Sequence, residues 1–499
     1  MSASAIRTAS LSSRRFCAAL FVAGLTLLGG CAIGPHYSRP SAPAAPAFKE
    51  TPENWKLAQP ADQILRGNWW EIYQDLQLNQ LEEKVSVSNQ TLKAAEAQFE
   101  QARAVVQQNR SQYFPTVNAS VSPSQNRLSR NAPNVTPATK VNYTDLVLPV
   151  DVSYEIDLWG RIRHTVENAR ANAQATAADL ESASLSIHAE LATDYFQART
   201  LDAEIRLLDS TVAAYQKAME LTQNRYNGGI ASQVDVAQAQ TQLETTRAQE
   251  IDLGVQRAQF EHAIAVLTGQ PPSTFSLAAM ELHATPPVIP PGIPAELLQR
   301  RPDIAAAERR VAAANAQIGV ARAAYFPSLT LNADAGFESA SVTNWLSGPS
   351  GFAAAGLTAL ETLFDAGRRR AISEQAEAAY DQSVANYRQT VLTAFQEVED
   401  SLAALRILEQ EATTQAGAVT AAEHSLSLSN NRYRGGVASY LEVITAQSQA
   451  LSNERTAVQI SGERMTNSVL LIKALGGGWD ISSLPVVKKP SSSPNPSAL

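Results

Sequence analysis

The sequence has few of the residues that supply covalent cross-links, metal ligands or catalytic groups. Two of its 499 residues are cysteine, Cys17 and Cys31, and both lie near the N-terminus. The six histidines are scattered without the paired spacing of a zinc site, and the sequence shows no nucleophile–base or phosphate-binding motif. We therefore expect no metal, no cofactor and no enzymatic activity.

Charge clusters and long apolar runs are also scarce. The net charge is −8 and no basic cluster is present, so nucleic acid is not an expected partner. Beyond the N-terminal region the sequence contains no stretch of ~18 uninterrupted apolar residues, the length that a membrane-spanning helix needs. A crossing of the membrane would therefore require amphipathic strands closed into a barrel.

The N-terminus does contain an export signal. Three arginines among the first 15 residues precede an apolar segment, residues 16–28, which is too short to span a membrane stably. The small residues before Cys31 resemble a bacterial lipobox. We predict that residues 1–30 are a lipoprotein signal peptide and that Cys31 is lipidated; an ordinary signal peptide followed by an incidental cysteine is the alternative. In either case Cys17 leaves with the signal, so no disulfide is expected.

The sequence is internally duplicated. Residues 224–232 reappear as residues 431–439, 207 residues later, with the core Asn-Arg-Tyr-x-Gly-Gly in both copies. Tyr113-Phe114-Pro115 reappears with nearly the same shift as Tyr325-Phe326-Pro327. This unit is far longer than a solenoid repeat, so it indicates a duplicated half-molecule.

Each half has the pattern of a helix, two strands, a very long helix, a turn and a shorter helix. Prolines are absent from residues 161–226 and 368–433, and each of these 66-residue stretches would form a helix about 100 Å long. Helices of this length indicate a coiled coil or a bundle. The Asn-Gly-Gly sequence at 227–229 would end the first one with a left-handed cap.

These patterns predict the following elements and domains. We expect one helix from about residue 70 to residue 112 and strands at 116–126, 146–158, 329–337 and 352–364. The predicted organisation is a signal peptide (1–30), a lipid-anchored tether (31–67), a first structural repeat (68–270, with a strand hairpin at 116–158 and a helical hairpin at 161–268), a proline-rich joint (271–300), a second structural repeat (301–475, with a strand hairpin at 328–364 and a helical hairpin at 368–475) and a disordered tail (476–499).

The second predicted strand has one apolar and one acidic face. Apolar residues alternate from Leu146 to Leu158, whereas Asp151, Glu155 and Asp157 lie on the opposite face. A soluble sandwich edge could show this pattern, but it also fits a membrane barrel, in which polar residues face inward. We predict that the three acids line the lumen of a barrel. Four strands per chain are too few to close one, so closure requires several symmetry-related chains.

Several motifs together resemble the TolC-like outer-membrane factors of bacterial tripartite efflux systems, in the NodT-like lipoprotein branch. The resemblance covers residues 31–476. It implies an α+β membrane protein made of a duplicated half-molecule, a homotrimer whose twelve-stranded β-barrel takes four strands from each chain and continues as a long periplasmic tunnel of helices. The motifs are the lipobox, the two Tyr-Phe-Pro strand entries, Asp157-Leu158-Trp159-Gly160-Arg161, Leu363-Phe364-Asp365-Ala366-Gly367-Arg368, Arg301-Pro302-Asp303 and the paired Arg-Tyr turns.

The resemblance also implies a function and partners. The chain would be an outer-membrane exit channel that receives drugs and other toxic small molecules from a periplasmic adaptor and an inner-membrane pump of the RND type. Its other partners would be two further copies of itself and the lipid of the outer membrane. Two alternatives stay open: an outer-membrane channel of a type I protein secretion system, and a structural coiled-coil lipoprotein that remains in the periplasm.

In the family that the chain resembles, the periplasmic end of the tunnel is a gated constriction, which would fall at the two repeated turns. The resemblance assigns Tyr433 and Asp235 to a latch between helices and Leu441 to a hydrophobic ring. Glu442 would form an acidic ring or, alternatively, cap its own helix in the pattern Ser439-x-x-Glu442. Two neighbouring aromatic residues complete the candidate gate, Tyr226 and Tyr440.

The two repeated turns diverge directly after their shared core. The first continues as Gln233-Val234-Asp235 and the second as Tyr440-Leu441-Glu442. The pattern Ser232-x-x-Asp235 has the spacing of a capping box, but its shorter acid fits less well than Glu442 does. We predict that the second turn lines the constriction and that the first braces it.

Overall fold

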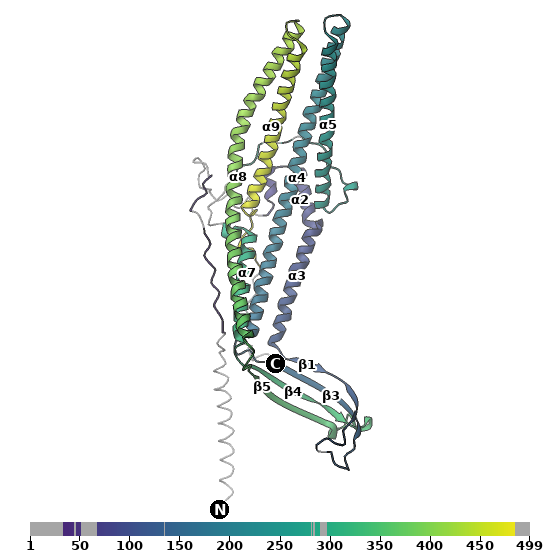
Figure 1. Ribbon diagram of the computed structural model, residues 1–499, viewed down its shortest axis with the longest axis vertical. Coiled ribbons are helices and arrows are strands. Elements are labelled where there is room, and N and C mark those ends of the chain that lie inside the picture. Colours follow the sequence, from purple (N-terminus) through teal and green to yellow (C-terminus); the bar gives the residue numbers. More distant parts are fainter. Residues whose placement is uncertain are drawn as a thin grey trace, which may run out of the picture.

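The computed structural model describes residues 33–43, 46–50, 67–133, 135–280, 282, 285–289 and 297–484. The predicted signal peptide and Cys31 lie outside these residues. The described chain is elongated, with long helices standing on a curved sheet (Figure 1). Within it, no helix combines the length and the apolar character needed to cross a membrane.

Two helices of equal length run along the whole helical region. α4 (Arg161–Asn227) and α8 (Arg368–Arg434) contain 67 residues each, against the 66 predicted for both. Each begins after a glycine in the left-handed conformation, Gly160 with φ 86° and Gly367 with φ 87°. Because neither helix contains proline, the backbone hydrogen bonds continue without a break.

The shorter helices pack beside these two. α5 (Gln233–Leu267) and α9 (Tyr440–Ala474) return from the distal turns, and both contain 35 residues. α3 (Gln90–Arg110) and α7 (Pro302–Ala323) lie nearer the sheet (Figure 1). The two halves of the molecule therefore contain matching sets of helices, as the duplicated sequence predicts.

The helix expected from residue 70 to residue 112 is divided in the structure. A short 3-10 helix (Trp69–Tyr73) precedes α2 (Leu76–Ser88), and Asn89 separates α2 from α3. Asn89 has an extended ψ of 124°, and its side chain accepts the N–H of Leu92 at 3.0 Å. A single asparagine thus ends one helix and caps the next, because its amide competes with the helical hydrogen bonds.

The sheet contains five strands, and all of its neighbouring strands are antiparallel. The strands fill four places across the sheet, because two short ones share one edge. The two central strands are β3 (Asn142–Glu155) and β4 (Ser328–Ser339), and β5 (Gly351–Leu360) forms one edge. β1 (Thr116–Ala119) and β2 (Ser122–Arg127) follow one another along the other edge and both pair with β3, so the first predicted strand is interrupted. Among the described residues, neither edge of the sheet has a further partner strand.

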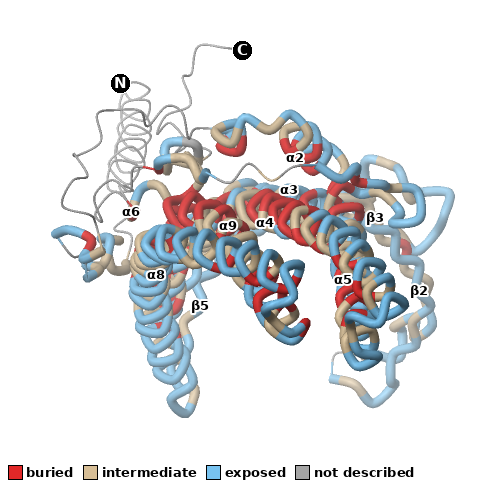
Figure 2. The backbone as a smooth tube through the Cα atoms, turned by 90° about the horizontal axis from the view of Figure 1, so that it is seen from above, coloured by how far each residue is buried: buried red, intermediate tan, exposed pale blue. Residues whose placement is uncertain are grey.

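The helices form a curved wall, which Figure 2 shows from its end. Near the sheet, α3 packs on α4, α4 on α7, and α7 on α8; toward the distal turns, the order is α5, α4, α9 and α8. Within the described chain, α8 is therefore one flank of the wall, and α3 and α5 are the other. The two edges of the sheet lie on the same two flanks. β5 lies on the α8 flank because it leads into α8, and β1 lies on the α3 flank because α3 leads into it.

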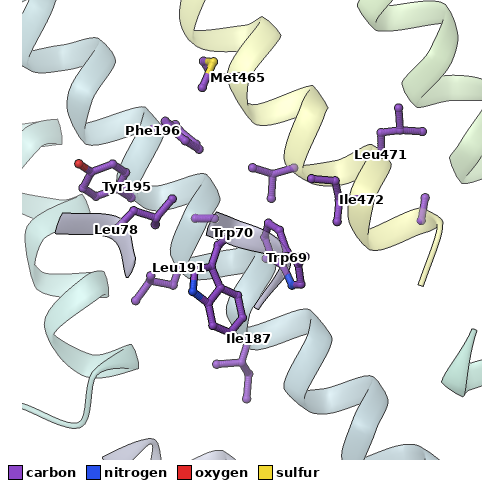
Figure 3. Packing of buried hydrophobic residues seen from close by; sticks show 14 of the residues in the cluster. Trp69, Trp70, Leu78, Ile187, Leu191, Tyr195, Phe196, Met465, Leu471 and Ile472 are labelled. Carbon is purple, nitrogen blue, oxygen red and sulfur yellow. The ribbon is translucent and has the colours of Figure 1, made fainter. Parts of the chain in front are cut away.

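A large hydrophobic core lies midway along the helices, where the short 3-10 helix packs against α4 and α9 (Figure 3). Trp69, Leu191 and Ile472 are almost fully buried there. The core also encloses two ionisable residues: Glu82 Oε2 and His188 Nδ1 lie 2.6 Å apart, and His188 stacks on Trp70 with ring centres 4.5 Å apart. Burial raises the pKa of Glu82 and lowers the pKa of His188 to about 4.

The described part of the predicted tether, residues 33–43 and 46–50, crosses the helices as a strap. At one end, the Ile33 N–H donates to the carbonyl of Trp159 at 3.1 Å. Farther along, Arg39 Nε donates to the hydroxyl of Tyr387 on α8 at 3.2 Å. Glu50 accepts hydrogen bonds from Arg406, also on α8. The strap therefore joins the sheet end of α4 to the middle of α8.

The chain stays ordered beyond residue 476, where the sequence predicted a disordered tail. Trp479, Ile481 and Leu484 pack against a buried alanine cluster on α4 and α7, which consists of Ala178, Ala305 and Ala306. The prediction was wrong for residues 476–484 because these three apolar side chains find small partners there. The rest of the predicted tail lies outside the described residues.

Candidate functional site at the paired distal turns

The helical hairpins end, far from the sheet, in two turns with the same backbone geometry (Figure 1). Gly229 in the first turn has a φ of 75°, and Gly436 in the second has a φ of 74°, which a side chain would strain. In each turn, the residue after the glycine pair donates its N–H to a carbonyl five residues earlier, Ile230 to Arg225 at 2.8 Å and Val437 to Arg432 at 3.0 Å. The duplicated sequence therefore forms a duplicated turn.

A buried tyrosine pair lies next to the second turn. The rings of Tyr433 and Tyr440 have centres 5.2 Å apart, and the side chains are only 6% and 3% exposed. They pack with Val443 of α9 and Ala239 of α5. Burial, together with the neighbouring Tyr433, raises the pKa of Tyr440 to about 12, so this hydroxyl stays protonated at physiological pH.

Arg225 connects the two turns. Its Cζ lies 4.6 Å from the centre of the Tyr433 ring, and its Nη1 donates to the carbonyl of Arg434 at 3.3 Å. The Tyr433 hydroxyl lies 3.5 Å from Oγ1 of Thr222, which is buried on α4. These contacts join the first sequence copy to the second.

Sequence reasoning did not identify Arg225 or Thr222. The available signal was the arginine that precedes the tyrosine in both copies, Arg225 and Arg432. The two arginines make different contacts, because Arg225 stacks on Tyr433 whereas Arg432 lies 3.5 Å from the carboxylate of Glu442. Identity between the copies therefore conceals a difference in role.

The capping prediction was the reverse of what the structure shows. The Asp235 carboxylate accepts the Ser232 N–H at 2.9 Å while Ser232 Oγ accepts the Asp235 N–H at 3.2 Å, which is a complete capping box for α5. Ser439 makes no side-chain cap for α9, and Glu442 turns instead toward Arg432. The short acid reaches the Ser232 amide at the start of its own helix, whereas the longer acid has Arg432 of α8 within reach.

The structure does not pair the two residues assigned to the latch. Asp235 bonds to Ser232, and the Tyr433 hydroxyl lies beside Thr222. The other candidate gate residues, Tyr226 and Leu441, are 40% and 57% exposed. Their apolar surface is therefore available for contact with another molecule at the distal end.

The three predicted lumen acids occupy different environments. Asp151 lies on β3 directly opposite Asp334 of β4, and within the described chain its carboxylate makes no ion pair. Glu155 is the last residue of β3 and accepts two hydrogen bonds from Arg161, at 2.8 and 2.7 Å. Asp157 lies beyond the strand, where it accepts the N–H groups of the first turn of α4. The prediction of a shared strand face was therefore wrong for Asp157, because helix N–H groups without partners attract a carboxylate.

Comparisons with known proteins agree with this architecture. The family model described as outer membrane efflux protein matches residues 81–270 and 293–477. The antibiotic efflux pump outer membrane protein ArpC of Pseudomonas putida is 33% identical over 455 residues, which cover 91% of this chain and 94% of that protein. The solvent efflux pump outer membrane protein SrpC of the same species is 32% identical over 469 residues, which cover 92% and 97%.

A solved structure shows the same fold. The outer-membrane channel OprN matches with a TM-score of 0.83 and 31% sequence identity, and the match covers 90% of this chain and 100% of that chain. The fold class predicted from the sequence is thereby confirmed. The family match spans most of both repeats, from α2 to the end of α9. The chain therefore belongs to the outer membrane efflux protein family.

Proposed function

We propose that three copies of this chain form the exit duct of a tripartite efflux system in the outer membrane. The observation that carries the proposal is the curved wall made by one chain. In it, a sheet that is four strands wide continues into helices about 100 Å long. Both flanks of this wall and both sheet edges lack partners in the described chain. Closed rotational symmetry pairs each free edge with the opposite edge of the next copy, which gives a twelve-stranded barrel and a helical tunnel.

The transported molecules would be small toxic compounds. The names of ArpC and SrpC attribute antibiotic and solvent efflux to those two proteins, and this chain aligns with nearly all of each. A passive duct has no means of driving export against a gradient. We propose that an inner-membrane pump of the RND type supplies the energy and that a periplasmic adaptor connects it to the distal turns.

The strap supports a lipid anchor at Cys31. Ile33 is hydrogen-bonded to Trp159, at the junction of the sheet and α4. Two extended residues reach about 7 Å, so a lipid on Cys31 would enter the membrane beside this junction. The lipid would therefore mark the periplasmic boundary of the membrane-spanning sheet.

The paired turns would form the gate at the periplasmic end. Arg225 and the tyrosine pair hold the two turns of one chain together, and the exposed Leu441 would meet its copies around the ring. Glu442 lies next to Leu441 and would add an acidic ring that concentrates cations at the entrance. Asp151 would be the acid that lines the barrel.

Deletion of the gene, followed by a panel of antibiotics and organic solvents, tests this function. We expect increased susceptibility to some of these compounds and recovery with the wild-type gene. Secreted proteins are measured in the same strains. Unchanged susceptibility together with the loss of a secreted protein would favour the type I secretion channel instead.

A further inference from the structure

The segment that joins β5 to α8 contains the most exposed large apolar side chains of the described chain. Leu363 and Phe364 are 91% and 86% exposed. The segment lies where the helices meet the sheet (Figure 1), so in the proposed barrel it is at the periplasmic boundary of the membrane. Apolar and aromatic side chains exposed at this level are typical of residues that enter the interface between lipid and water.

Three arginines follow this apolar pair directly, at the start of α8, and one of them takes both acids of the junction. Arg369 Nε donates to Asp365 at 2.8 Å, and Arg369 Nη1 donates to Glu361 at 3.0 Å. No acid of the segment between β5 and α8 is therefore left for the two arginines on either side, Arg368 and Arg370.

These two flanking arginines are exposed. Among the described residues, the Arg368 side chain takes part in no ion pair. Arg370 pairs with Glu374 at 2.8 Å, one helical turn farther from the sheet, and the two side chains are 81% and 61% exposed. Exposed ion pairs of this kind contribute little to stability, so a phosphate group can take the place of the Glu374 carboxylate.

The first sequence copy shows how the same junction is neutralised in the other half of the molecule. Between β3 and α4, Glu155 accepts two hydrogen bonds from Arg161, and Asp157 accepts one from Arg163 at 3.2 Å. Two acids thus match two arginines there. In the second copy Arg369 occupies both acids, so the second junction has an excess of positive charge beside its apolar pair.

A neighbouring copy does not supply the missing acid. The proposed ring brings the edge formed by α3, β1 and β2 of the next copy to this flank. Residues 101–144, which include the end of α3 and both strands, contain no aspartate and no glutamate, whereas Arg103 and Arg110 lie among them. A second copy would therefore add positive charge, and the counter-anion must come from outside the protein.

We propose that the β5–α8 junction binds a phospholipid with a net negative headgroup in the inner leaflet of the outer membrane. Leu363 and Phe364 contact the acyl chains, while Arg368 and Arg370 bind the phosphate. Guanidinium groups suit this role because their planar donors bind a phosphate through two hydrogen bonds at once. The inference rests on the proposed membrane-spanning barrel and adds the class of lipid and the residues that bind it.

Native mass spectrometry of the purified trimer in mild detergent tests the site. The trimer is mixed with equal amounts of phosphatidylglycerol, which is anionic, and phosphatidylethanolamine, which has no net charge. We expect up to three phosphatidylglycerol molecules to bind in preference, one to each chain. Arg368→Gln with Arg370→Gln should weaken this binding roughly 30-fold, since each arginine at a membrane surface contributes about a factor of five.

The matched control is Arg432→Gln with Arg434→Gln. These two exposed arginines have the same spacing and lie at the other end of α8, so the control removes the same charge far from the membrane and should bind lipid as the wild type does. Arg368→Lys with Arg370→Lys keeps the charge and should retain most of the preference. Phe364→Ser should weaken the binding of both lipids equally. If R368Q/R370Q does not reach the membrane, the single variants replace it, each with a roughly 5-fold loss.

The other outcomes are distinct. Equal binding of the two lipids by the wild type, or an equal loss in the control, would overturn the anionic-lipid site. Displacement of phosphatidylglycerol by an equal concentration of inorganic phosphate would also overturn it, because the site would then recognise a free anion. A wild-type trimer that binds no lipid, together with an arginine variant that dissociates, would assign the arginines to contacts between copies. A wild-type protein that forms no trimer and is absent from the outer membrane would overturn the proposed function as well.

Discussion

Replacing Arg225 by alanine should make it easier for the two distal turns of a chain to separate. The change removes the stacking of the guanidinium on Tyr433 and the hydrogen bond to the Arg434 carbonyl. Stacking of this kind contributes about 0.5–1 kcal/mol and a long neutral-acceptor hydrogen bond about 0.5–1.5 kcal/mol. The sum, about 1–2.5 kcal/mol per chain, corresponds to a roughly 5- to 70-fold shift toward the separated arrangement.

The assay is single-channel conductance in planar bilayers. We expect Arg225→Ala to show a higher mean conductance or longer open times than wild type, and Arg225→Lys to lie between them because it keeps the charge. Arg247→Ala is the matched control. Arg247 lies on the same helical hairpin and pairs with Glu244 at 3.3 Å. Both side chains are about half exposed, so this ion pair contributes little to stability.

The result that would refute this reasoning is equal conductance for Arg225→Ala, Arg247→Ala and wild type. The contacts of Arg225 would then hold the first turn in shape without opposing its separation from the second. A change of the same size in Arg247→Ala would instead indicate a general effect of charge at the channel entrance.

Three further predictions concern stability. Asp235→Ala removes the carboxylate that accepts the Ser232 N–H, one of the two hydrogen bonds of the α5 capping box, and should cost about 0.5–1.5 kcal/mol locally. Faster hydrogen exchange of the Ser232 amide would reveal this loss, and unchanged exchange would contradict the cap. Gly436→Ala places a side chain at φ 74° and should lower the free energy of unfolding by about 1–2 kcal/mol, measured by thermal unfolding. Gly254→Ala is the control: it lies in the middle of α5, no atom lies near the added methyl group, and the change should be neutral or stabilising. Burial raises the pKa of Glu82 above its ordinary 4.5, so the wild type should lose stability as pH rises above that value, and Glu82→Gln should abolish this loss. Burial also lowers the pKa of His188 from 6.5 to about 4, so both proteins should lose stability as pH falls through that interval; identical pH profiles of unfolding temperature would contradict the role of Glu82.

Long elements were predictable because their signals are local and strong. The absence of proline sets the extent of α4 and α8, and a glycine marks each start and end. Alternation of apolar residues placed the sheet strands within a few residues of their observed bounds. The break at Asn89 was not predictable from periodicity, since the apolar spacing continues across it and only a single side chain redirects the backbone.

The contacts at the candidate gate were harder to predict. Arg225 and Arg434 are 209 residues apart, and nothing in the local sequence says which copy of the arginine faces the other turn. Asp157 shows a related difficulty, because strand alternation and helix capping both suit an acid at that position. The competition is decided by where the strand ends, which depends on the pairing of β3 with β4.

The strap has a consequence for the order in which the chain folds. The strap, residues 33–43 and 46–50, is synthesised early, yet the groups that hold it include Glu308, Tyr387, Glu399 and Arg406, which follow their partners in the sequence by 271 to 356 positions. Such distant contacts form late because loop closure must precede them. Most of the N-terminal segment must therefore stay undocked until the second half has folded, and during that interval it is accessible to any enzyme that acts on the N-terminal part of the chain.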